Sequence, residues 1–531
     1  MLAPLVAILC VVASCVIGTT PPNIIVIIGD DVGWSGVSYH NTTKATSSAL
    51  PEIRTPNIDF LMGSGIDLTR HYVYRFCSPS RSSFQSGRLP VHVNTLNVAP
   101  EFRNASNPVT GYQGIARTMT GIATKMRSVG YSTHMTGKWD AGMATIQHTP
   151  IGRGFDSWLG YFHHANDYFT EGLPLKAIGK LNICFNQFKD LWGPFQGPAK
   201  NYTGKGIYEE EIFTNRTLAV IKSHDISSPL FLVHSFHLVH TPLEVPTSYL
   251  SRFSFIDNEQ RKHYSAMTSY MDDQIGIFVK ALKAKGEDFF NNTLIIFFAD
   301  NGGAIYNPAG GNNHPLKGGK MSDWEGGIRS TAFVSGGYVP KEKRGTSSSA
   351  LLHVSDWYRT FCHLAGGVDP EDAAAVGLPK VDGIDVSLIL FGNSSDDDII
   401  TAANQMNEDR VLHISEQTII VGQYKLISGI QAMSGWTGAL YPNNTGTQPT
   451  YIPLSWNHDC KDGELYNIID DPNEHENVAA IYPEIVLSLQ NKLLELNKNN
   501  FNPNRGRADR AACVQARKVG GYYGPWVDLP L

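Results

Sequence analysis

A short apolar run near the start of the chain has the sequence Asn23-Ile-Ile-Val-Ile-Ile-Gly29 and leads directly into Asp30 and Asp31. β-Branched residues pack well on a pleated strand, and an unbroken apolar run of this length is typical of a strand that is buried on both faces. Such strands belong to parallel sheets that helices cover on both sides. The run therefore predicts a central strand of an α/β domain, with two carboxylates at its carboxyl end.

Three more apolar runs end in polar residues. They span residues 131–136, which lead into Gly137 and Lys138, residues 229–236, which lead into His237 and His240, and residues 293–298, which lead into Asp300 and Asn301. Helical patterns lie between them, as at residues 118–129 and 264–282. Buried strands that alternate with helices predict an α/β domain with a mainly parallel sheet. Ligands of such sheets bind outside the carboxyl ends of the strands, so we expect these polar residues to meet in one site.

The sequence pattern changes near residue 400. An acidic stretch at residues 393–398 is followed by short alternating segments at residues 411–415, 418–421 and 426–428 and by a helical pattern at residues 483–496. These features predict a smaller C-terminal α+β domain with an antiparallel sheet. We therefore divide the chain into residues 1–20, 21–400 and 401–531, and we expect the middle segment to carry the site at the strand ends.

Residues 1–20 form an apolar segment with small residues near its end and no charged side chain. The segment is short for a membrane span and predicts a secretory signal peptide. A bacterial lipoprotein signal is the alternative, because Val12-Ala13-Ser14-Cys15 resembles its cleavage box. Seven N-x-S/T sequons favour export as a glycoprotein. They begin at Asn41, Asn104, Asn201, Asn215, Asn291, Asn393 and Asn443. We expect a secreted or lysosomal protein with no integral membrane span.

The formal net charge is −6 and no long basic block occurs, which argues against nucleic acid as a partner. The cysteines outside residues 1–20 are Cys77, Cys184, Cys362, Cys460 and Cys513. An odd count in an exported protein indicates one special thiol. If that thiol is Cys77, the other four could form two disulfides, and all three pairings remain open.

The most specific local motif is Cys77-Ser78-Pro79-Ser80-Arg81, which continues to Gly87 and Arg88. Pro79 suits the first turn of a helix, so Cys77 would lie at a helix N-terminus, where free N–H groups and the helix dipole favour anions. Arg81 follows one turn later on the same face. A nucleophile, an anion site and a guanidinium group would then converge. A structural cysteine before an ordinary helix is the alternative.

The strand-end residues Asp30, Asp31, Asp300 and Asn301 offer only oxygen ligands. Calcium and magnesium prefer such ligands, whereas zinc prefers His and Cys. Each pair alone is also typical of a turn after a strand. Two such pairs at the ends of two buried strands, beside the Cys77 motif, predict a site for a hard divalent cation.

The Cys77 motif resembles the signature of the sulfatase family, in which a formylglycine-generating enzyme converts the cysteine to formylglycine. A second family motif spans Gly130 to Trp139, and the resemblance implies that Lys138 contacts the substrate sulfate. The family usually has a histidine two residues later, where this chain has Asp140. Asp140 could act as a base, His148 could supply the imidazole, or the change could reduce activity.

The resemblance covers most of the chain. It implies that His240 and Lys320 bind the sulfate, with Lys317 as a competitor of Lys320. The string Trp324-Glu-Gly-Gly-Ile-Arg329 looks most like the arylsulfatase B branch. The resemblance also implies an alkaline-phosphatase-like fold and one calcium ion. The implied calcium ligands are Asp30, Asp31, Asp300, Asn301 and a formylglycine oxygen at Cys77.

The activity that the resemblance implies is the hydrolysis of sulfate esters. A hydrated formylglycine at position 77, deprotonated with the help of calcium and Arg81, would attack sulfur while Lys138, Lys320 and His240 hold the sulfate. Substrates would be aryl sulfates or sulfated glycans, and specificity would lie in loops such as residues 160–204. Two alternatives remain: a phosphatase or phosphodiesterase of the same superfold, and an inactive glycoprotein that only binds sulfated glycans.

Overall fold

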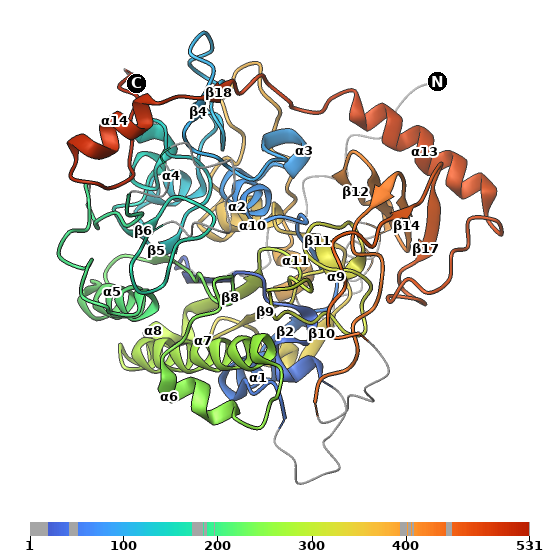
Figure 1. Ribbon diagram of the computed structural model, residues 1–531, viewed down its shortest axis with the longest axis horizontal. Coiled ribbons are helices and arrows are strands. Elements are labelled where there is room, and N and C mark those ends of the chain that lie inside the picture. Colours follow the sequence, from blue (N-terminus) through green and yellow to red (C-terminus); the bar gives the residue numbers. More distant parts are fainter. Residues whose placement is uncertain are drawn as a thin grey trace.

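The structure is a computed structural model (Figure 1). It describes residues 20–41, 51–172, 184, 188–195, 197–392, 401, 405, 408–441 and 449–529. The predicted signal peptide lies outside the described residues except for Thr20, and so do the sequons at Asn393 and Asn443. Within the described residues, no helix combines the length and the apolar character that a membrane crossing requires.

The centre of the molecule is an eight-stranded sheet in the order β10-β2-β9-β8-β1-β7-β5-β6. The strands on one side of the centre are β8 (Thr293–Ala299), β1 (Asn23–Gly29), β7 (Leu230–Ser235), β5 (Ser132–Lys138) and β6 (Ser157–Tyr161), and each is parallel to its neighbours in this series. Among the described strands of this sheet, β9 (Ala332–Ser335) alone pairs antiparallel, with β8 on one side and β2 (Ile66–Leu68) on the other. The edge strand β10 (Thr346–Ser348) is parallel to β2. The prediction of a mainly parallel sheet is confirmed.

Helices cover both faces of this sheet (Figure 1). Ile24, Val26 and Ile28 of β1 face one hydrophobic core, and Ile25 and Ile27 face another. The first core includes side chains of α2 (Cys77–Ser86), α4 (Ile122–Arg127) and α10 (Asp356–Leu364), and the second includes those of α1 (Pro56–Gly63), α5 (Glu209–Ser223) and α7 (Glu259–Lys283). With both faces covered, a ligand can reach the sheet only at the strand ends.

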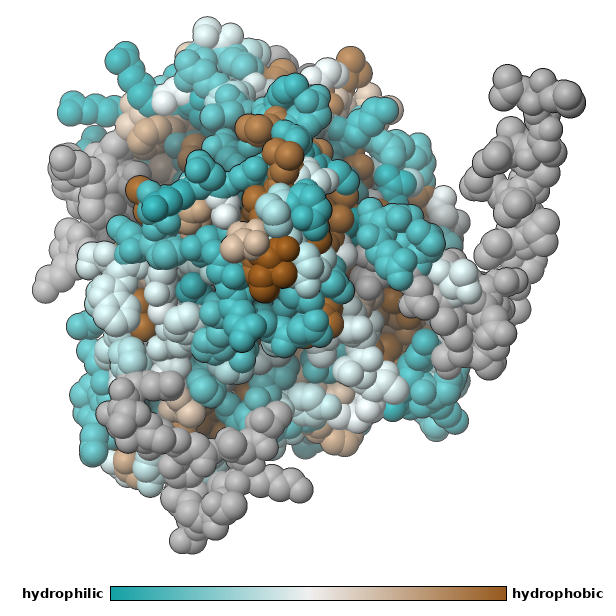
Figure 2. Space-filling model, turned by 90° about the vertical axis from the view of Figure 1, so that its right-hand side faces the viewer, coloured by the Kyte–Doolittle hydropathy of each residue, from teal (hydrophilic) through white to brown (hydrophobic). Residues whose placement is uncertain are grey.

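A separate antiparallel sheet has the strand order β12-β13-β14-β17. Its strands are β12 (Val411–Ser415), β13 (Thr418–Val421), β14 (Tyr424–Ile427) and β17 (Glu464–Asn467), and α13 (Pro483–Asn497) packs against them through Leu489 and Leu493. The three alternating segments predicted after residue 400 are therefore strands, and the helical pattern is a helix. The face that carries this sheet is mainly hydrophilic, with a narrow hydrophobic band near its centre (Figure 2).

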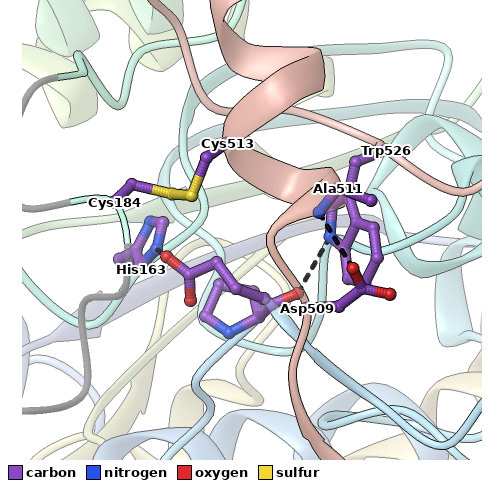
Figure 3. Close-up of a disulfide and its surroundings, with 8 residues drawn as sticks. His163, Cys184, Asp509, Ala511, Cys513 and Trp526 are labelled. Carbon is purple, nitrogen blue, oxygen red and sulfur yellow. Dashed lines mark hydrogen bonds and ion pairs between the residues drawn. A yellow bond between two sulfur atoms is a disulfide. The ribbon is translucent and has the colours of Figure 1, made fainter.

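The chain returns to the α/β unit after α13. β18 (Arg507–Ala508) pairs with β4 (Phe102–Arg103), and α14 (Ala511–Lys518) is joined to the same unit by the disulfide Cys184–Cys513 (Figure 3). Trp526 Nε1 donates a hydrogen bond to the carbonyl of Pro100. The tail thus lies against the first part of the chain.

Cys362 and Cys460 are buried and free. The expectation of two disulfides is therefore wrong, and one disulfide forms. The two remaining cysteines cannot pair because they lie in different hydrophobic cores. Cys362 of α10 belongs to the core on one face of the central sheet, and Cys460 belongs to a core beside the antiparallel sheet.

Candidate active site

The polar residues at the strand ends meet around Cys77, the first residue of α2. Asp30 and Asp31 follow β1, Lys138 ends β5, His240 follows β7, Asp300 and Asn301 follow β8, and Arg81 lies one turn into α2. None of these residues exposes more than 9% of its surface. The structure thus brings together the strand-end residues and the Cys77 motif that the sequence singled out.

α2 holds Cys77 rigidly at this point. The backbone is extended at Phe76, with φ −137° and ψ 155°, and the helix begins at Cys77. Pro79 occupies the first turn, which suits its fixed φ. Gly87 ends the helix with φ 68°, where a Cβ atom would lie 2.7 Å from the Tyr358 ring, so glycine is required. Every residue of α2 is buried, and the helix is therefore fixed within the core.

Cys77 lies between a carboxylate and an ammonium group. Its Sγ atom is 3.5 Å from Asp30 Oδ1 and 3.3 Å from Lys320 Nζ. Burial and the nearby Asp300 raise the pKa of the Cys77 thiol well above its ordinary value, and Lys138 and Lys320 offset only part of this rise. The unmodified thiol is therefore protonated at neutral pH and is a poor nucleophile.

Two buried lysines each contact an aspartate. Lys138 Nζ lies 2.6 Å from Asp30 Oδ2, and Lys320 Nζ lies 2.7 Å from Asp31 Oδ1. Burial would lower the pKa of both lysines, but the carboxylates beside them raise it above the ordinary value. Burial opposes the charge of Asp31 as well, yet Lys320 and His240 lower its pKa to about 2. Both lysines therefore stay charged next to Cys77.

Arg81 is held by bonds on two sides. Its Nε donates to Asp300 Oδ2 at 2.8 Å, and its Nη1 donates to the Lys138 carbonyl at 3.2 Å. Its Nη2 has no hydrogen-bond partner among the described residues and lies 3.9 Å from Asp30 Oδ2. Arg81 is thus a fixed positive charge that still has N–H groups to offer a ligand.

His240 contributes a neutral imidazole. Its Nδ1 donates to the Thr241 carbonyl at 2.6 Å, and its Nε2 lies 3.8 Å from Asp31 Oδ2. Burial and the positive charge of Lys320 lower the pKa of His240 to about 3. The Nδ1–H bond leaves the Nε2 lone pair directed toward the site.

Three of the residues predicted as metal ligands, Asp31, Asp300 and Asn301, contact one another, and Asp30 contacts Cys77. Asp31 N donates to Asp300 Oδ1 at 3.4 Å, and Asn301 Nδ2 donates to Asp31 Oδ1 at 2.8 Å. Asn301 Oδ1 is buried and accepts no hydrogen bond from any described residue. Ligand atoms of Asp30, Asp31, Cys77 and His240 lie within 4.8 Å of one another. An orphaned amide oxygen among three carboxylates fits a hard divalent cation.

Asp140 lies beside this group in a left-handed backbone conformation, with φ 51°. Ser78 Oγ donates to its Oδ1 at 2.6 Å, whereas its Oδ2 has no hydrogen bond and lies 3.7 Å from Lys138 Nζ. Burial raises the pKa of Asp140, and Lys138 counteracts this only in part. Asp140 is thus a buried side chain that contacts Ser78, the residue next to Cys77 in the chain, and its Oδ2 has no hydrogen-bond partner among the described residues.

His148 does not take the place of the missing family imidazole. Its Nδ1 bonds to Thr145 Oγ1 at 2.9 Å, and its ring packs 4.9 Å from that of Tyr112. Burial holds its pKa well below the ordinary value, and the charges that act on it are arginines such as Arg153, none of them from the Cys77 group. The structure therefore keeps His148 apart from the residues around Cys77.

Lys317 and Lys320 have different surroundings. Lys320 contacts Cys77 and Asp31, as described above. The ammonium group of Lys317 lies over the rings of Trp324, Trp436 and Tyr466, at 3.5, 4.9 and 5.6 Å from their centroids. Cation–π attraction holds Lys317 in this aromatic cage, and Lys320 is the lysine that faces the site.

His164, which lies three residues after β6, is not among the residues that the sequence predicted for the site. Its Nδ1 is buried and has no hydrogen-bond partner among the described residues. Burial and the nearby Lys138 hold the pKa of His164 well below its ordinary value, with smaller effects of His240 and Lys320. A neutral imidazole, whose Nδ1 has no partner in the described part of the chain, is thus within the electrostatic influence of the cationic groups. Its only sequence signal was its place in the segment 160–204, where specificity was expected.

Comparison with known proteins identifies the family. The Sulfatase family model matches residues 22–368, about two thirds of the chain. The chain belongs to the sulfatase family. Arylsulfatase J of Mus musculus is 31% identical over 535 residues, which cover 96% of this chain and 81% of that protein. N-acetylgalactosamine-6-sulfatase of the same species is 25% identical over 496 residues, which cover 89% of this chain and 87% of the relative.

Solved structures agree on the fold. The crystal structure of Ps i-CgsB in complex with k-i-k-neocarrahexaose superposes with a TM-score of 0.68 and 24% identity, and covers 94% of this chain and 98% of that chain. The protein is therefore a sulfatase of the α/β sulfatase fold, and it hydrolyses sulfate esters. A phosphatase of the same superfold is excluded by the family match. The curated relatives above lie in the arylsulfatase J and N-acetylgalactosamine-6-sulfatase groups, so the match supports the family and not the arylsulfatase B branch specifically.

Proposed function

We propose that this sulfatase cleaves its substrate with a formylglycine derived from Cys77 and with a calcium ion held by Asp30, Asp31, Asp300 and Asn301. The observation that carries the proposal is the state of Cys77. The thiol lies at the centre of the cationic groups, yet its pKa is raised by burial and Asp300. As a thiol it would attack poorly. A formylglycine would supply, in hydrated form, one hydroxyl that attacks sulfur and a second that later releases the sulfate.

The charges around Cys77 support the calcium ion. The buried carboxylates of Asp30, Asp31, Asp140 and Asp300 outnumber the buried cations of Arg81, Lys138 and Lys320. The excess is one negative charge. One divalent cation would turn it into one positive charge, which suits an anionic substrate, and would satisfy Asn301 Oδ1. When bound, calcium would stabilise negative charge on an oxygen at position 77 and on the sulfate.

Lys138 and Lys320 would bind the sulfate oxygens. Each now contacts one aspartate, at 2.6 and 2.7 Å. If Asp30 and Asp31 held a metal, both ammonium groups would be free to bind the substrate. Negative charge then grows on the sulfate oxygens in the transition state, and fixed cations in a buried site stabilise it without reorganisation. Arg81, with its unpaired Nη2, would favour the deprotonated nucleophile.

His240 would protonate the leaving alcohol oxygen. Its ring is neutral without substrate, because burial and Lys320 lower its pKa to about 3. An arriving sulfate anion offsets the field of Lys320 and favours the protonated ring. Nδ1 already donates to the Thr241 carbonyl, so Nε2 is the nitrogen that would gain and then transfer the proton.

Asp140 would act as the base that accepts a proton from the nucleophile. It stands where the family usually has a histidine. Its buried Oδ2 has no hydrogen-bond partner, and Ser78 holds its Oδ1 at 2.6 Å. A carboxylate that is oriented by one bond and open at its other oxygen suits proton transfer.

His164, on the neighbouring strand end, would contact the alcohol half of the substrate.

The proposed substrate class is sulfated carbohydrate, with aryl sulfates as artificial substrates. The names of the curated relatives, arylsulfatase J and N-acetylgalactosamine-6-sulfatase, support it. The arylsulfatase B branch remains our finer assignment, on the strength of the string Trp324 to Arg329. A formylglycine-generating enzyme would be the partner during maturation.

We further propose that residues 1–20 direct the chain into the secretory pathway, with a secreted or lysosomal destination. The disulfide Cys184–Cys513 supports an oxidising compartment, and three sequon asparagines are exposed: Asn201, Asn215 and Asn291. Residues 21–400 and 401–531 would be the catalytic and the smaller unit. Removal of N-glycans by a glycosidase should increase the electrophoretic mobility of the protein isolated from its source. Unchanged electrophoretic mobility would contradict export as a glycoprotein.

The proposal is tested at position 77. In protein made in a secretory pathway, mass spectrometry should find the Cys77 peptide in the lighter, aldehyde form. Cys77→Ala should lower kcat/KM on an aryl sulfate by at least about 1,000-fold, whereas Cys362→Ala, at the other buried free thiol of the α/β unit, should stay within about threefold. An active enzyme with an intact thiol would refute the formylglycine. An inactive protein with an intact thiol would favour a glycan-binding role.

A further inference from the structure

A second group of metal-binding side chains lies outside the active site, next to the antiparallel sheet. It consists of His458, Cys460 and Glu464, whose ligand atoms all lie within 4.8 Å of one another. Two of the three side chains reach solvent: His458 is exposed and Glu464 is partly exposed. Cys460 is buried, with 3% of its surface exposed. A metal ion could therefore reach the group from outside while the sulfur stays inside.

The local fold brings these three side chains together. His458 belongs to β16 (His458–Asp459), which pairs with β15 (Ile430–Gln431), and Glu464 begins β17. Between them the chain reverses at Lys461, with φ 47°, and at Gly463, with φ 132°. Cys460 N donates to the Gly429 carbonyl at 2.9 Å, and Gly463 N donates to the Cys460 carbonyl at the same distance. The turn thus returns Glu464 to the side of Cys460.

The two surface ligands are already oriented. His458 Nε2 lies 2.7 Å from Glu464 Oε1, and Tyr466 donates a hydrogen bond to Glu464 Oε2 at 2.6 Å. Such an outer hydrogen bond to a ligating carboxylate is typical of metal sites. Tetrahedral zinc with bonds of 2.0 to 2.3 Å needs ligand atoms about 3.3 to 3.7 Å apart. The group meets this spacing after shifts of about 1 Å or less.

Cys460 is the feature that an ordinary histidine–glutamate pair does not explain. The chain forms a disulfide elsewhere, yet Cys460 stays free. The other free thiol outside the active site, Cys362, lies in the α/β core and belongs to no cluster of metal-binding side chains among the described residues. A buried thiol beside an imidazole and a carboxylate has a use as a metal ligand that Cys362 lacks.

We propose that His458 Nε2, Cys460 Sγ and Glu464 Oε1 bind one zinc ion, with water as the fourth ligand. The ligand set decides the metal, since sulfur and imidazole nitrogen favour zinc over calcium. Binding replaces the S–H bond by a Zn–S bond and releases the thiol proton to solvent. The hydrogen bond between His458 Nε2 and Glu464 Oε1 is replaced by bonds from both atoms to zinc, and the ring proton moves to Nδ1. No oxidant or reductant is involved. The site is distinct from the oxygen-only cation site beside Cys77.

The ion would connect the antiparallel pair β15–β16 to β17. The His458 ring lies 6.3 Å from the Trp324 ring, which also covers Lys317. The site thus borders the segment that leads from Lys320 into the antiparallel sheet. Zinc that binds only the folded chain stabilises it by mass action.

The test uses full-length protein with Cys77→Ala, so that the active-site thiol cannot contribute. Cobalt(II) alone is the spectroscopic probe, because a cobalt–thiolate bond gives an intense near-ultraviolet band that oxygen ligands do not give. Titration should produce this band at one equivalent, and zinc alone should abolish it. Cys460→Ser should remove the band and weaken zinc binding by roughly 100-fold, whereas Cys362→Ser should leave both unchanged.

The remaining variants cover a failure of Cys460→Ser to fold. Glu464→Gln keeps the shape of the side chain and should weaken zinc binding by about tenfold or more. Apparent zinc affinity should fall about tenfold for each pH unit below neutrality, because one thiol proton is displaced. Absence of the cobalt–thiolate band, or equal zinc affinity in the parent and in both ligand variants, overturns the proposal. Neither result bears on the sulfatase activity.

Discussion

His163 is a residue at which a single substitution should have a large pH-dependent effect on stability. Its Nδ1 lies 2.7 Å from Asp190 Oδ2, its Nε2 lies 3.1 Å from Glu101 Oε1, and its ring packs 4.5 Å from that of Tyr523. Burial opposes the charge of the ring, but Asp190 and Glu101 raise the pKa of His163 to about 10. The residue lies close to the Cys184–Cys513 disulfide (Figure 3).

The size of the effect follows from this pKa. Compared with an ordinary value of 6.5, a folded-state value of about 10 corresponds to about 5 kcal/mol as an upper bound. Removal of one member of a buried ion pair costs about 3 to 5 kcal/mol by comparison with other proteins. At about 2.1 cal/mol/K of unfolding entropy per residue, a chain of this length loses about 1 °C per kcal/mol. His163→Gln should therefore lower the unfolding temperature by about 3 to 5 °C.

The sign of the pH dependence is fixed, because the folded-state pKa is raised. The stabilisation is complete below about pH 6.5 and is lost as the pH rises through about 10. Thermal unfolding followed by circular dichroism should show the full difference between wild type and His163→Gln at about pH 6 and almost none at about pH 10.5. His363→Gln, at a half-exposed pair with Asp385, is the matched control and should change stability by less than about 1 kcal/mol at either pH. A wild-type advantage that persists undiminished at the higher pH would refute the reasoning.

Lys320→Ala should lower kcat/KM on an aryl sulfate by at least about 100-fold, whereas Lys317→Ala, in the aromatic cage, should stay within about threefold once the protein is folded; equal losses would contradict the assignment. Asp140→Asn keeps the acceptor for Ser78 but loses the base, so kcat should fall about 100-fold with little change in KM, and an unchanged kcat would exclude Asp140 as the base. His164→Ala should lower kcat/KM on N-acetylgalactosamine sulfates by about tenfold more than on nitrophenyl sulfate, and a uniform loss would argue against contact with the alcohol half. Removal of divalent ions with a chelator should abolish turnover, and calcium should restore turnover where zinc does not; full activity after exhaustive chelation would contradict the calcium assignment.

The central strands could be predicted because their signal is local. β1 and β8 are unbroken apolar runs whose burial on both faces follows from composition alone. The polar residues that follow them could be assigned to one site because parallel strands end at the same edge. β6 was not predicted: Ser157-Trp-Leu-Gly-Tyr161 is short and contains a glycine, and it is a strand only because β5 pairs with it.

His164 shows the consequence of missing β6. The residues around His164 in the sequence do not distinguish it from a surface histidine. Its place near the site can be seen only once β6 is paired with β5, the strand that carries Lys138. The disulfide likewise could not be predicted from local sequence. Cys184 and Cys513 are 329 residues apart and come together only because the C-terminal tail returns to the α/β unit. Asp140 is the reverse case: its position could be predicted from the family motif, but its contact with Ser78 is visible only in the structure.

The returning tail changes what can be cut from this protein. A stop codon after α13 would remove a C-terminal segment that the sequence alone suggests is dispensable, because the segment follows the helix that packs on the antiparallel sheet. It would also strip the partner strand from β4, leave Cys184 as an unpaired thiol and uncover the surface beneath Trp526. Shortened versions made for crystallisation should therefore keep the chain through Trp526, and a fusion partner is better attached beyond that point than in place of it.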